Sequence, residues 1–471
     1  MVKKILLIYP NNEKMPYPVP PIGLSLLASV LKEKYRVLLF DGMFGTAESL
    51  TREINGFKPD YIGISIRNID NVQVDNIVYY VDGILNHYIL RIRKITDVPV
   101  ILGGSGFSIF PGELMELLGA DYGVVGEGEE LFLRLLSLLD RGKPGRGIPG
   151  IIEKDRGVFE YPLQKFNIKK LPHSEIDGKI DFAPYRERSS YPIQTKRGCS
   201  HKCIYCTYPE IEGKTYRTRD PEDIAEEIAE VHGRLGDITF EFVDSTFNDP
   251  PGHAEAICSR IVKKGLKIKL RAMGINPAHA SRELFSLMLK AGFSQIDCTP
   301  DTASETMIAN FQKNFSLEEL KRTALLIREF RIPVMWFFIF GGPGETEKTI
   351  AESFDFIDRY IYKYDLVHIS TGLRIYPNTP LYRIALKEGV ISRDNSILYP
   401  EYYVNKKLGQ GRLKGVIEKG VSTRFNCLTS SDSKPAPEMM EEALELRRKT
   451  PFDEPMFRTL LRLREKTFSP G

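Results

Sequence analysis

Short apolar runs alternate with amphipathic stretches over the first third of the chain. The runs are rich in Ile, Val and Leu, as in buried strands, and we place strands at KKILLIY, RVLLFD, DYIGISI, PVILGG and DYGVVGE. Helical spacing marks the segments between them, such as PIGLSLLASVLKEK and ELMELL. Strands that alternate with helices predict a parallel sheet with helices on both faces. We therefore expect residues 1–145 to form a doubly wound, Rossmann-like α/β domain.

A segment rich in Gly and Pro, RGKPGRGIPG, interrupts this pattern, and we expect a linker segment at 146–190 that includes a hairpin-like stretch, GIIEKDRGVFEYP. The alternation then returns over 191–392. Six strands are expected there, at PIQTKRG, ITFEFVD, KIKLRAMG, SQIDCTP, PVMWFFIFGG and LVHISTGLRIY. Six β/α units predict a partial (β/α)6 barrel with its chemistry at the C-terminal ends of the strands. Residues 393–471 lose this rhythm and predict a small helical C-terminal region.

Composition adds little about partners. The 65 Lys and Arg residues nearly balance the 62 Asp and Glu residues, and no basic run is interleaved with aromatic residues, so we expect no nucleic-acid partner. The apolar stretch of MVKKILLIYPNN is too short for a signal-peptide core or a membrane span. We expect a cytoplasmic protein with no membrane span.

Three of the six cysteines, Cys199, Cys203 and Cys206, lie close together in RGCSHKCIYCTYP. In a reducing compartment such a group indicates metal or redox chemistry rather than disulfides. A structural zinc site takes four ligands, and His201 lies inside the first loop of the motif, where it is poorly placed to complete a tetrahedron. Iron-sulfur clusters of four irons normally take four thiolates, so three cysteines leave one iron open to a substrate or cofactor.

The motif C-x-x-x-C-x-x-C, with Tyr205 before its last cysteine, follows the first strand of the six-unit domain and resembles the motif of the radical S-adenosylmethionine (SAM) superfamily. Further stretches are similar to the subgroup that has an N-terminal cobalamin-binding domain: YRTRDPEDIAEEI, EFVDSTFN, GGPGETEKTI, TGLRIYPNTPLY, PPIGLSLLASVL, PDYIGIS, VPVILGG and DYGVVGEGEE. The resemblance covers residues 1–390 approximately. It implies a 4Fe-4S cluster on the three cysteines, SAM on the open iron, and cobalamin on the first domain.

The resemblance also implies contacts to SAM. The end of the second barrel strand offers its backbone to the SAM amino group, and in this chain that segment is Asp244, Ser245 and Thr246. Asp301, after the fourth strand, occupies the place of a residue that contacts the SAM ribose; as a residue type it equally suits a helix N-cap.

Contacts to cobalamin follow in the same way. Ser65, Gly103 and Gly104 match the serine and glycine positions that line the nucleotide tail of cobalamin. Arg217 and Arg374 are candidates for the SAM carboxylate or the cobalamin amides, although surface ion pairs are an equal alternative for each. No catalytic residue is identified.

Many cobalamin domains carry D-x-H-x-x-G after the first strand, and this chain does not. Its first histidine is His87, far from the end of the first strand at Tyr9. Either cobalamin binds without a protein histidine or the domain has lost cobalamin, and the intact GIS and VILGG segments favour the first alternative.

The resemblance implies an enzyme, and we expect a cobalamin-dependent C-methyltransferase. It would act on an unactivated carbon of a small molecule or lipid through a 5'-deoxyadenosyl radical and methylcobalamin, with an external electron donor such as flavodoxin or ferredoxin. The same two domains occur in enzymes of cyclisation, ring contraction and rearrangement, which are the enzymatic alternative. A non-catalytic cobalamin or iron-sulfur carrier is the alternative from a different class.

Overall fold

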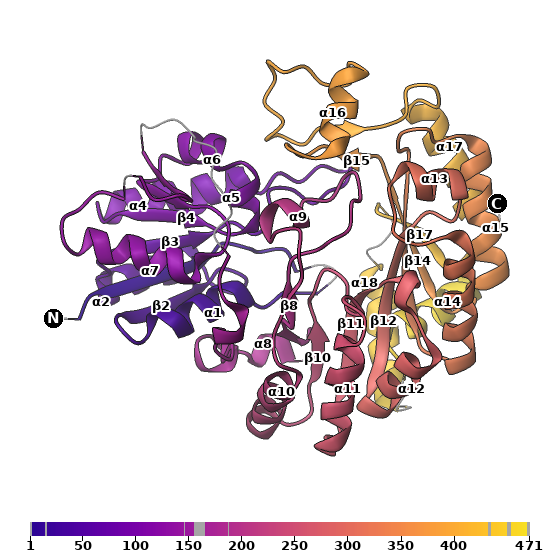
Figure 1. Ribbon diagram of the computed structural model, residues 1–471, viewed down its shortest axis with the longest axis horizontal. Helices are drawn as coiled ribbons and strands as arrows, with labels where there is room; N and C mark the ends of the chain where they lie inside the picture. Colours follow the sequence, from indigo (N-terminus) through magenta and orange to yellow (C-terminus); the bar gives the residue numbers. More distant parts are fainter. Residues whose placement is uncertain are drawn as a thin grey trace.

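Two α/β domains lie side by side in the computed structural model of the chain (Figure 1). The structure describes residues 2–14, 17–145, 147–154, 165–186, 188–431, 435–449 and 454–468. The N-terminal domain is on the left of the view and the partial barrel is on the right. In this part of the chain no helix is both long and apolar enough to cross a membrane.

The N-terminal sheet has the strand order β2-β1-β3-β4-β5-β6, and its first five strands run parallel. The order 2-1-3-4-5 is that of flavodoxin-like sheets, in which ligands bind where the order reverses, between β1 and β3. Its strands are β1 (Lys4–Tyr9), β2 (Arg36–Asp41), β3 (Tyr61–Ser65), β4 (Val100–Gly103), β5 (Tyr122–Val124) and β6 (Ile151–Glu153). The predicted doubly wound domain is confirmed.

Helices cover both faces of this sheet. They are α1 (Ile22–Leu31), α2 (Ala47–Phe57), α3 (Val81–Gly83), the π-helix η1 (Ile84–Ile89), α4 (Leu90–Ile95), α5 (Ser105–Ile109), α6 (Pro111–Leu118) and α7 (Gly128–Leu139). Both faces are therefore apolar, which explains why the strands of the sequence are continuous apolar runs rather than alternating ones.

The segment between the two domains begins later than predicted, and it contains regular secondary structure. Strand β6 lies beyond residue 145 and pairs antiparallel with β5, so the first sheet includes it. Three short helices follow, η2 (Ile168–Lys170), η3 (Ile176–Gly178) and α8 (Ala183–Arg186), and Ile176 and Tyr185 are fully buried. The rest of the predicted hairpin, at 155–164, lies outside the described residues.

The second sheet contains all six predicted barrel strands, which run parallel. They are β7 (Tyr191–Ile193), β10 (Thr239–Phe242), β11 (Lys269–Ile275), β12 (Phe293–Asp301), β13 (Val334–Phe340) and β14 (Leu366–Thr371). A further strand, β17 (Cys427–Thr429), pairs with β14 after the helix α17 (Gln410–Val421). The barrel sheet therefore extends into the region from 393 that was predicted as helical.

The outer layer of the barrel consists of amphipathic helices. In α10 (Pro221–Leu235) the Asp220 side chain accepts a hydrogen bond from a first-turn N–H, and Ile224, Ile228 and Val231 are buried. The others are α11 (His253–Lys263), α12 (Arg282–Ala291), α13 (Glu305–Asn310), α14 (Leu317–Phe330) and α15 (Glu347–Tyr360). Near the barrel mouth lie the short helix α9 (Tyr208–Ile211), the paired strands β8 (Lys196–Arg197) and β9 (Arg217–Thr218), the pair β15 (Leu373–Arg374) and β16 (Tyr402–Tyr403), and α16 (Pro380–Lys387).

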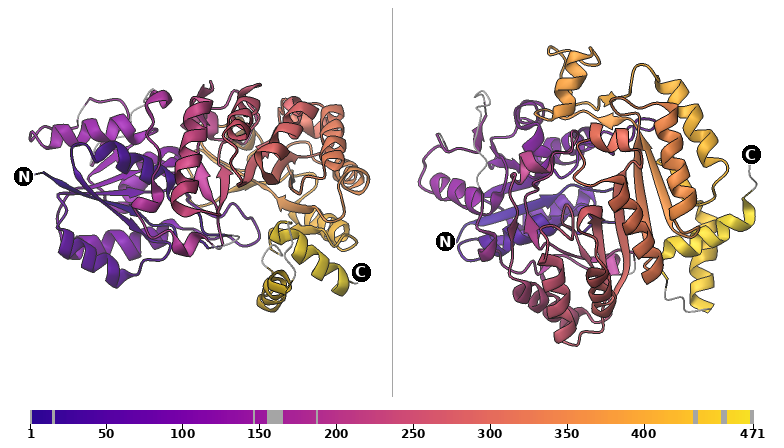
Figure 2. Two further views of the ribbon diagram at one scale, coloured as in Figure 1. Left: turned by 90° about the horizontal axis from the view of Figure 1, so that it is seen from below. Right: turned by 45° about the vertical axis from the view of Figure 1, so that its right-hand side comes forward.

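Two C-terminal helices, α18 (Pro437–Lys449) and α19 (Met456–Thr467), lie together beside the barrel strands (Figure 2). Phe457 and Leu461 of α19 pack on Leu366, the first residue of β14. Arg458 pairs with Asp365 at 2.6 Å in the same place. The helical appendage expected from the sequence thus covers the N-terminal end of the barrel strands.

A buried ion pair joins the two domains at the barrel mouth. Arg374 of β15 lies 3.0 Å from Asp70, in the loop after β3, and both side chains are almost completely buried. The other guanidinium N–H groups donate to backbone carbonyls, including those of Ile397 and Leu398. This single side chain holds the N-terminal domain and the segment after α16 together.

We expect Arg374→Gln to lower the free energy of unfolding by about 3–5 kcal/mol, because it leaves the Asp70 carboxylate buried and unpaired. Thermal denaturation measures the loss. Arg282→Gln is the matched control, because its partner Glu329 is exposed, and its melting temperature should stay close to that of the wild type. The double variant with Asp70→Asn should recover part of the loss, and equal stability of Arg374→Gln and the control would contradict the expected role.

Candidate functional site

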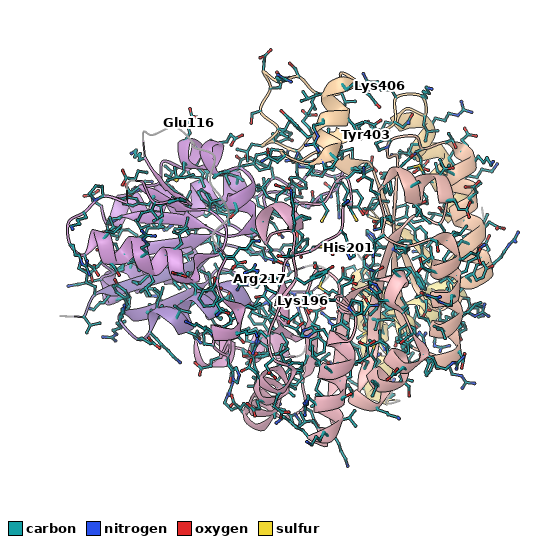
Figure 3. The ribbon with its side chains drawn as sticks, viewed as in Figure 1. Glu116, Lys196, His201, Arg217, Tyr403 and Lys406 are labelled. Atoms are coloured by element: carbon teal, nitrogen blue, oxygen red, sulfur yellow. The ribbon has the colours of Figure 1, made fainter. Side chains whose placement is uncertain are left out.

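One cavity of about 1880 Å³ extends from the carboxyl ends of the N-terminal strands into the barrel. Ligand pockets commonly measure about 300–1,000 Å³, so this cavity has room for more than one ligand. Its walls come from both domains and from the C-terminal helices. Figure 3 shows Lys196, His201 and Arg217 in the zone between the two domains.

The three cysteines of the motif are brought together next to this cavity, in the loop after β8. Burial raises the pKa of all three thiols, that of Cys206 to about 12, and Cys199 and Cys203 raise it further, so the thiols lie near one another. Among the described residues no three His, Cys, Asp or Glu side chains are placed around one metal ion. In an iron-sulfur cluster separate thiolates hold separate irons, so a group of neighbouring thiols is suited to such a site.

A second set of side chains holds the cysteine loop from the barrel side. His201 Nε2 lies 2.8 Å from Asp249 Oδ2, and His279 bonds the other oxygen of that carboxylate. The Tyr216 hydroxyl lies 3.0 Å from His201 Nε2 and 3.8 Å from Cys199 Sγ. His201 therefore faces Asp249 rather than serving as a fourth metal ligand. Sequence reasoning missed Asp249 and His279, whose positions are far from the motif along the chain.

Tyr205 and Asp301, both predicted site residues, are in direct contact. The Tyr205 hydroxyl donates to the Asp301 carboxylate, and Lys313 Nζ lies 2.6 Å from Asp301 Oδ2 and 3.3 Å from the Tyr205 oxygen. Ser304, not Asp301, is the N-cap of α13, so the N-cap alternative for Asp301 is wrong. Lys313 is a further member of the site, and no motif in the sequence marks it as one.

The predicted SAM-binding segment lies directly beside the cysteine loop. The Asp244 carboxylate accepts hydrogen bonds from the backbone N–H groups of Thr195 and Lys196, so its side chain supports the turn that leads into the loop. Burial raises the pKa of Cys199, and the Ser245 hydroxyl bonds the thiol and lowers that pKa. Thr246 continues the same turn after β10. The Asp244 side chain is therefore taken up by protein partners.

The two arginines proposed for cofactor contacts have protein partners. Arg217 Nη1 lies 2.9 Å from Glu127 Oε2 and 2.8 Å from the Phe166 carbonyl oxygen. Arg374 pairs with Asp70 as described above. The structure therefore uses both guanidinium groups to join the domains, and the ion-pair alternative holds for each, although the pairs are buried rather than on the surface.

Ser65, Gly103 and Gly104 lie at the ends of β3 and β4, where they line the cavity beside the β1/β3 reversal. Gly104 has φ +99°, and a Cβ there would lie 2.6 Å from the Ile66 carbonyl oxygen. A Cβ on Gly103 would meet only the Val124 carbonyl oxygen, at 3.7 Å. Gly104 is therefore required by the chain itself, whereas Gly103 leaves open wall for a bulky ligand.

No histidine of the N-terminal domain faces the cavity, as far as the described residues show. His87 is exposed on η1, and His368 of β14 is the one histidine among the lining residues. The loop after Tyr9 instead carries Tyr17 to the barrel, where its hydroxyl donates to Glu241 Oε1 at 3.2 Å. The loop after the first strand therefore contributes a tyrosine to the barrel.

A flavodoxin-like sheet that shares one cavity with a three-thiol partial barrel defines a two-domain enzyme built around more than one cofactor. Residues 193–357 match the Radical SAM superfamily model and residues 10–136 match the B12 binding domain model. Both ranges fall inside the predicted domains. The chain belongs to the radical SAM superfamily, in the group that carries an N-terminal B12 binding domain.

Known proteins of this kind are similar over most of the chain. An uncharacterized methyltransferase of Pyrococcus horikoshii is 26% identical over 83% of this chain and 84% of its own length. The tryptophan 2-C-methyltransferase of Streptomyces laurentii is 24% identical, covering 80% and 74%. The radical SAM methyltransferase TsrM from Kitasatospora setae, solved with cobalamin and a [4Fe-4S] cluster, is 22% identical, covers 99% and 100%, and superposes with a TM-score of 0.83.

Another relative catalyses a different reaction. The anaerobic magnesium-protoporphyrin IX monomethyl ester cyclase of Rubrivivax gelatinosus is 25% identical over 74% of this chain and 65% of its own length. The relatives are enzymes in each case, so the chain is an enzyme rather than a carrier. Methyltransferases and a cyclase are thus both among the proteins that this chain resembles.

We expect Gly104→Ala to destabilise the chain by about 1–3 kcal/mol, because φ +99° is open to glycine and the new Cβ would meet the Ile66 carbonyl oxygen. Gly103→Ala is the control and should stay within about 0.5 kcal/mol of the wild type. Thermal denaturation of the two variants compares them. Equal melting temperatures would show that the loop after β4 accepts a side chain.

Proposed function

We propose that the chain is a cobalamin-dependent radical SAM C-methyltransferase that acts on a small molecule. One observation carries the proposal: three neighbouring thiols lie in one loop, and Thr207, directly after the last of them, lines the same cavity as the ligand-binding edge of a flavodoxin-like sheet. The methyltransferase names of relatives that cover most of the chain support the reaction type.

The residues of the site fit the cofactors that this function needs. Cys199, Cys203 and Cys206 would hold a 4Fe-4S cluster, the backbone at 244–246 and Asp301 would contact SAM, and the wall at Gly103 would contact cobalamin. When bound, the cluster and SAM supply one-electron chemistry and cobalamin supplies a methyl carrier. An external electron donor such as flavodoxin or ferredoxin completes the system.

The chain itself contributes position and shielding. Asp249 orients His201, which keeps the loop between the first two cysteines against the barrel. Tyr205, Asp301 and Lys313 form a hydrogen-bonded group near Cys203, on the side of β12. Because charges act more strongly where water is excluded, these buried groups would hold a charged cofactor in one orientation.

The cluster assignment predicts about four irons per chain after anaerobic reconstitution. Cys199→Ala, Cys203→Ala and Cys206→Ala should each lose iron and SAM turnover, because few thiolates remain to hold the assembly. Cys258→Ala is the control: Cys258 is fully buried on α11, away from the motif, and its loss should leave iron content unchanged. Full iron content in any of the three motif variants, or zinc in place of iron, would refute the assignment.

Methyl transfer is distinguished from cyclisation by the fate of the methyl group. Cells that express the wild type and are fed methionine with a deuterated methyl group should accumulate a compound that carries the label, and cells that express Cys203→Ala should not. A product that depends on Cys203 but contains no label would support the cyclase alternative, which the Rubrivivax relative favours. Release of 5'-deoxyadenosine in the presence of SAM and dithionite provides a second, substrate-independent measurement.

A further inference from the structure

The inner face of the barrel has one polar wall and one apolar wall. Neighbouring strands β11 and β12 direct Arg271 and Asp297 into the cavity, and Glu241 of β10 lies beside Arg271. Strand β13 directs Met335 and Phe337 into it, in register with Asp297 and with β14. A molecule bound between these walls meets charged groups on one side and apolar groups on the other.

The charges of the polar wall are incompletely paired. Arg271 Nε lies 2.8 Å from Glu241 Oε1, and its guanidinium also lies over the Tyr17 ring, 4.2 Å from the centroid. These contacts involve the Nε atom and one face of the Arg271 guanidinium. Arg271 Nη2 is buried and has no hydrogen-bond partner in the part of the chain that the structure describes. A buried N–H group without a partner is costly, so this atom is suited to a ligand acceptor.

The Asp297 carboxylate has no ion-pair partner of its own among the described residues. Arg271 is already matched by Glu241, and the one hydrogen bond found for the Asp297 carboxylate, among the described residues, comes from Gln295 Nε2 at 3.3 Å. Burial raises the pKa of Asp297 to about 7 in spite of the nearby Arg271. A carboxylate in such a place is stabilised by a cation or a strong donor from a ligand.

Arg271 and Asp297 are diagonal neighbours on the sheet. Arg271 pairs in register with Gln295, two residues before Asp297 on the same face of β12. Adjacent strands lie about 4.8 Å apart and residues rise about 3.3 Å each, so the two Cα atoms are about 8 Å apart. Because both side chains extend into the cavity, one small head group with two polar ends can bridge them.

We propose that this part of the cavity binds the α-amino-acid head group of a small substrate. The substrate ammonium group donates to Asp297, and the substrate carboxylate accepts from Arg271 Nη2. Its apolar or aromatic side chain packs on Met335 and Phe337. A phosphate or other dianion suits the wall less well, because Glu241 already balances Arg271 and Asp297 adds negative charge. The inference rests on the proposed function, since it assigns the substrate class of the same cavity.

Calorimetric titration of the anaerobically reconstituted chain with each of the twenty standard L-amino acids tests the proposal. At least one amino acid should bind, and its decarboxylated and deaminated analogues should each bind at least tenfold more weakly. Equal binding of an analogue would show that the missing group is not recognised and would overturn the assignment of that group.

Variants locate the head group. Asp297→Asn and Arg271→Lys should each weaken binding of the best amino acid at least tenfold, because one removes the charge and the other the planar donor group. Asp355→Asn and Arg282→Gln, at exposed positions on α15 and α12, are the controls and should bind as the wild type does. Iron and cobalamin contents are measured in every variant, so that a general loss of structure is recognised. Unchanged binding in Asp297→Asn would overturn the proposal.

Binding should depend on pH through Asp297. Among the described residues, the other charged or titratable groups on the barrel side of the cavity are Arg271 and Lys269 on β11, His368 on β14, Tyr17, Arg188, and, from the C-terminal helices and the residues just before α19, Arg447, Arg448, Glu454 and Arg464; Glu241 adjoins Arg271. Because burial raises the pKa of Asp297 to about 7, the carboxylate gains its charge between pH 6 and pH 8, and binding should strengthen about tenfold over that interval. Asp297→Asn should remove this dependence.

The same shift predicts a change in stability without any ligand. A carboxyl group whose pKa is raised from 3.8 to about 7 favours the folded state below its unfolded pKa and loses that contribution as pH rises through the folded value. Asp297→Asn should therefore melt at a higher temperature than the wild type at pH 8. A variant that is more stable but does not bind cannot be explained by misfolding.

The outcomes separate the inference from the proposed function. If the wild type takes up iron and cobalamin but binds no amino acid, the inference is overturned and the proposed function stands. If it takes up neither cofactor, the proposed function fails and the inference fails with it.

Discussion

Four paired charges between the two domains, two of them buried and two half-buried, determine where the cysteine loop begins. Strands β8 and β9 place Arg197 and Arg217 opposite each other, an arrangement that like charges disfavour. Glu127 and Glu129, at the start of α7 in the other domain, pair with them, for example at 3.1 Å between Arg197 Nη1 and Glu129 Oε2. Arg197 is two residues before Cys199. The ion pairs that join the domains therefore also set the position of the first thiol, and the shared cavity depends on their presence.

The cost of burying charge recurs through the site and explains much of its layout. Removing a carboxylate or guanidinium from water is unfavourable unless a partner compensates. Arg374, Arg217 and Asp244 meet that condition with partners from the protein, and each serves to hold one segment against another. Asp297 does not, which is why it is the exception that points to a ligand. Structural and ligand-binding charges are thus distinguished by how completely the chain itself satisfies them.

The sequence predicted the α/β fold class well because its signals are local. Apolar runs such as KKILLIY and PVMWFFIFGG are strands in the structure, and the spacing of the three cysteines reflects one loop. Strand β17 was missed because three residues give no usable periodicity. The contacts of His201 with Asp249, 48 residues away, and of Arg374 with Asp70, 304 residues away, depend on the docking of distant segments. A residue type shows that a group can donate or accept, but its partner is decided by the tertiary fold.

Tyr17 belongs to the N-terminal domain but forms part of the inner surface of the barrel. Its loop leaves the first strand of one domain, and its ring lies on Arg271 of the other, at the polar wall of the cavity. The two domains are therefore not interchangeable modules, even though each has its own sheet. Recombination with a related protein, in nature or in the laboratory, would bring together a barrel and a loop that had not been selected for each other. The cavity would then change its shape near Arg271, and the substrate specificity of the chimaera would depend on both parent proteins.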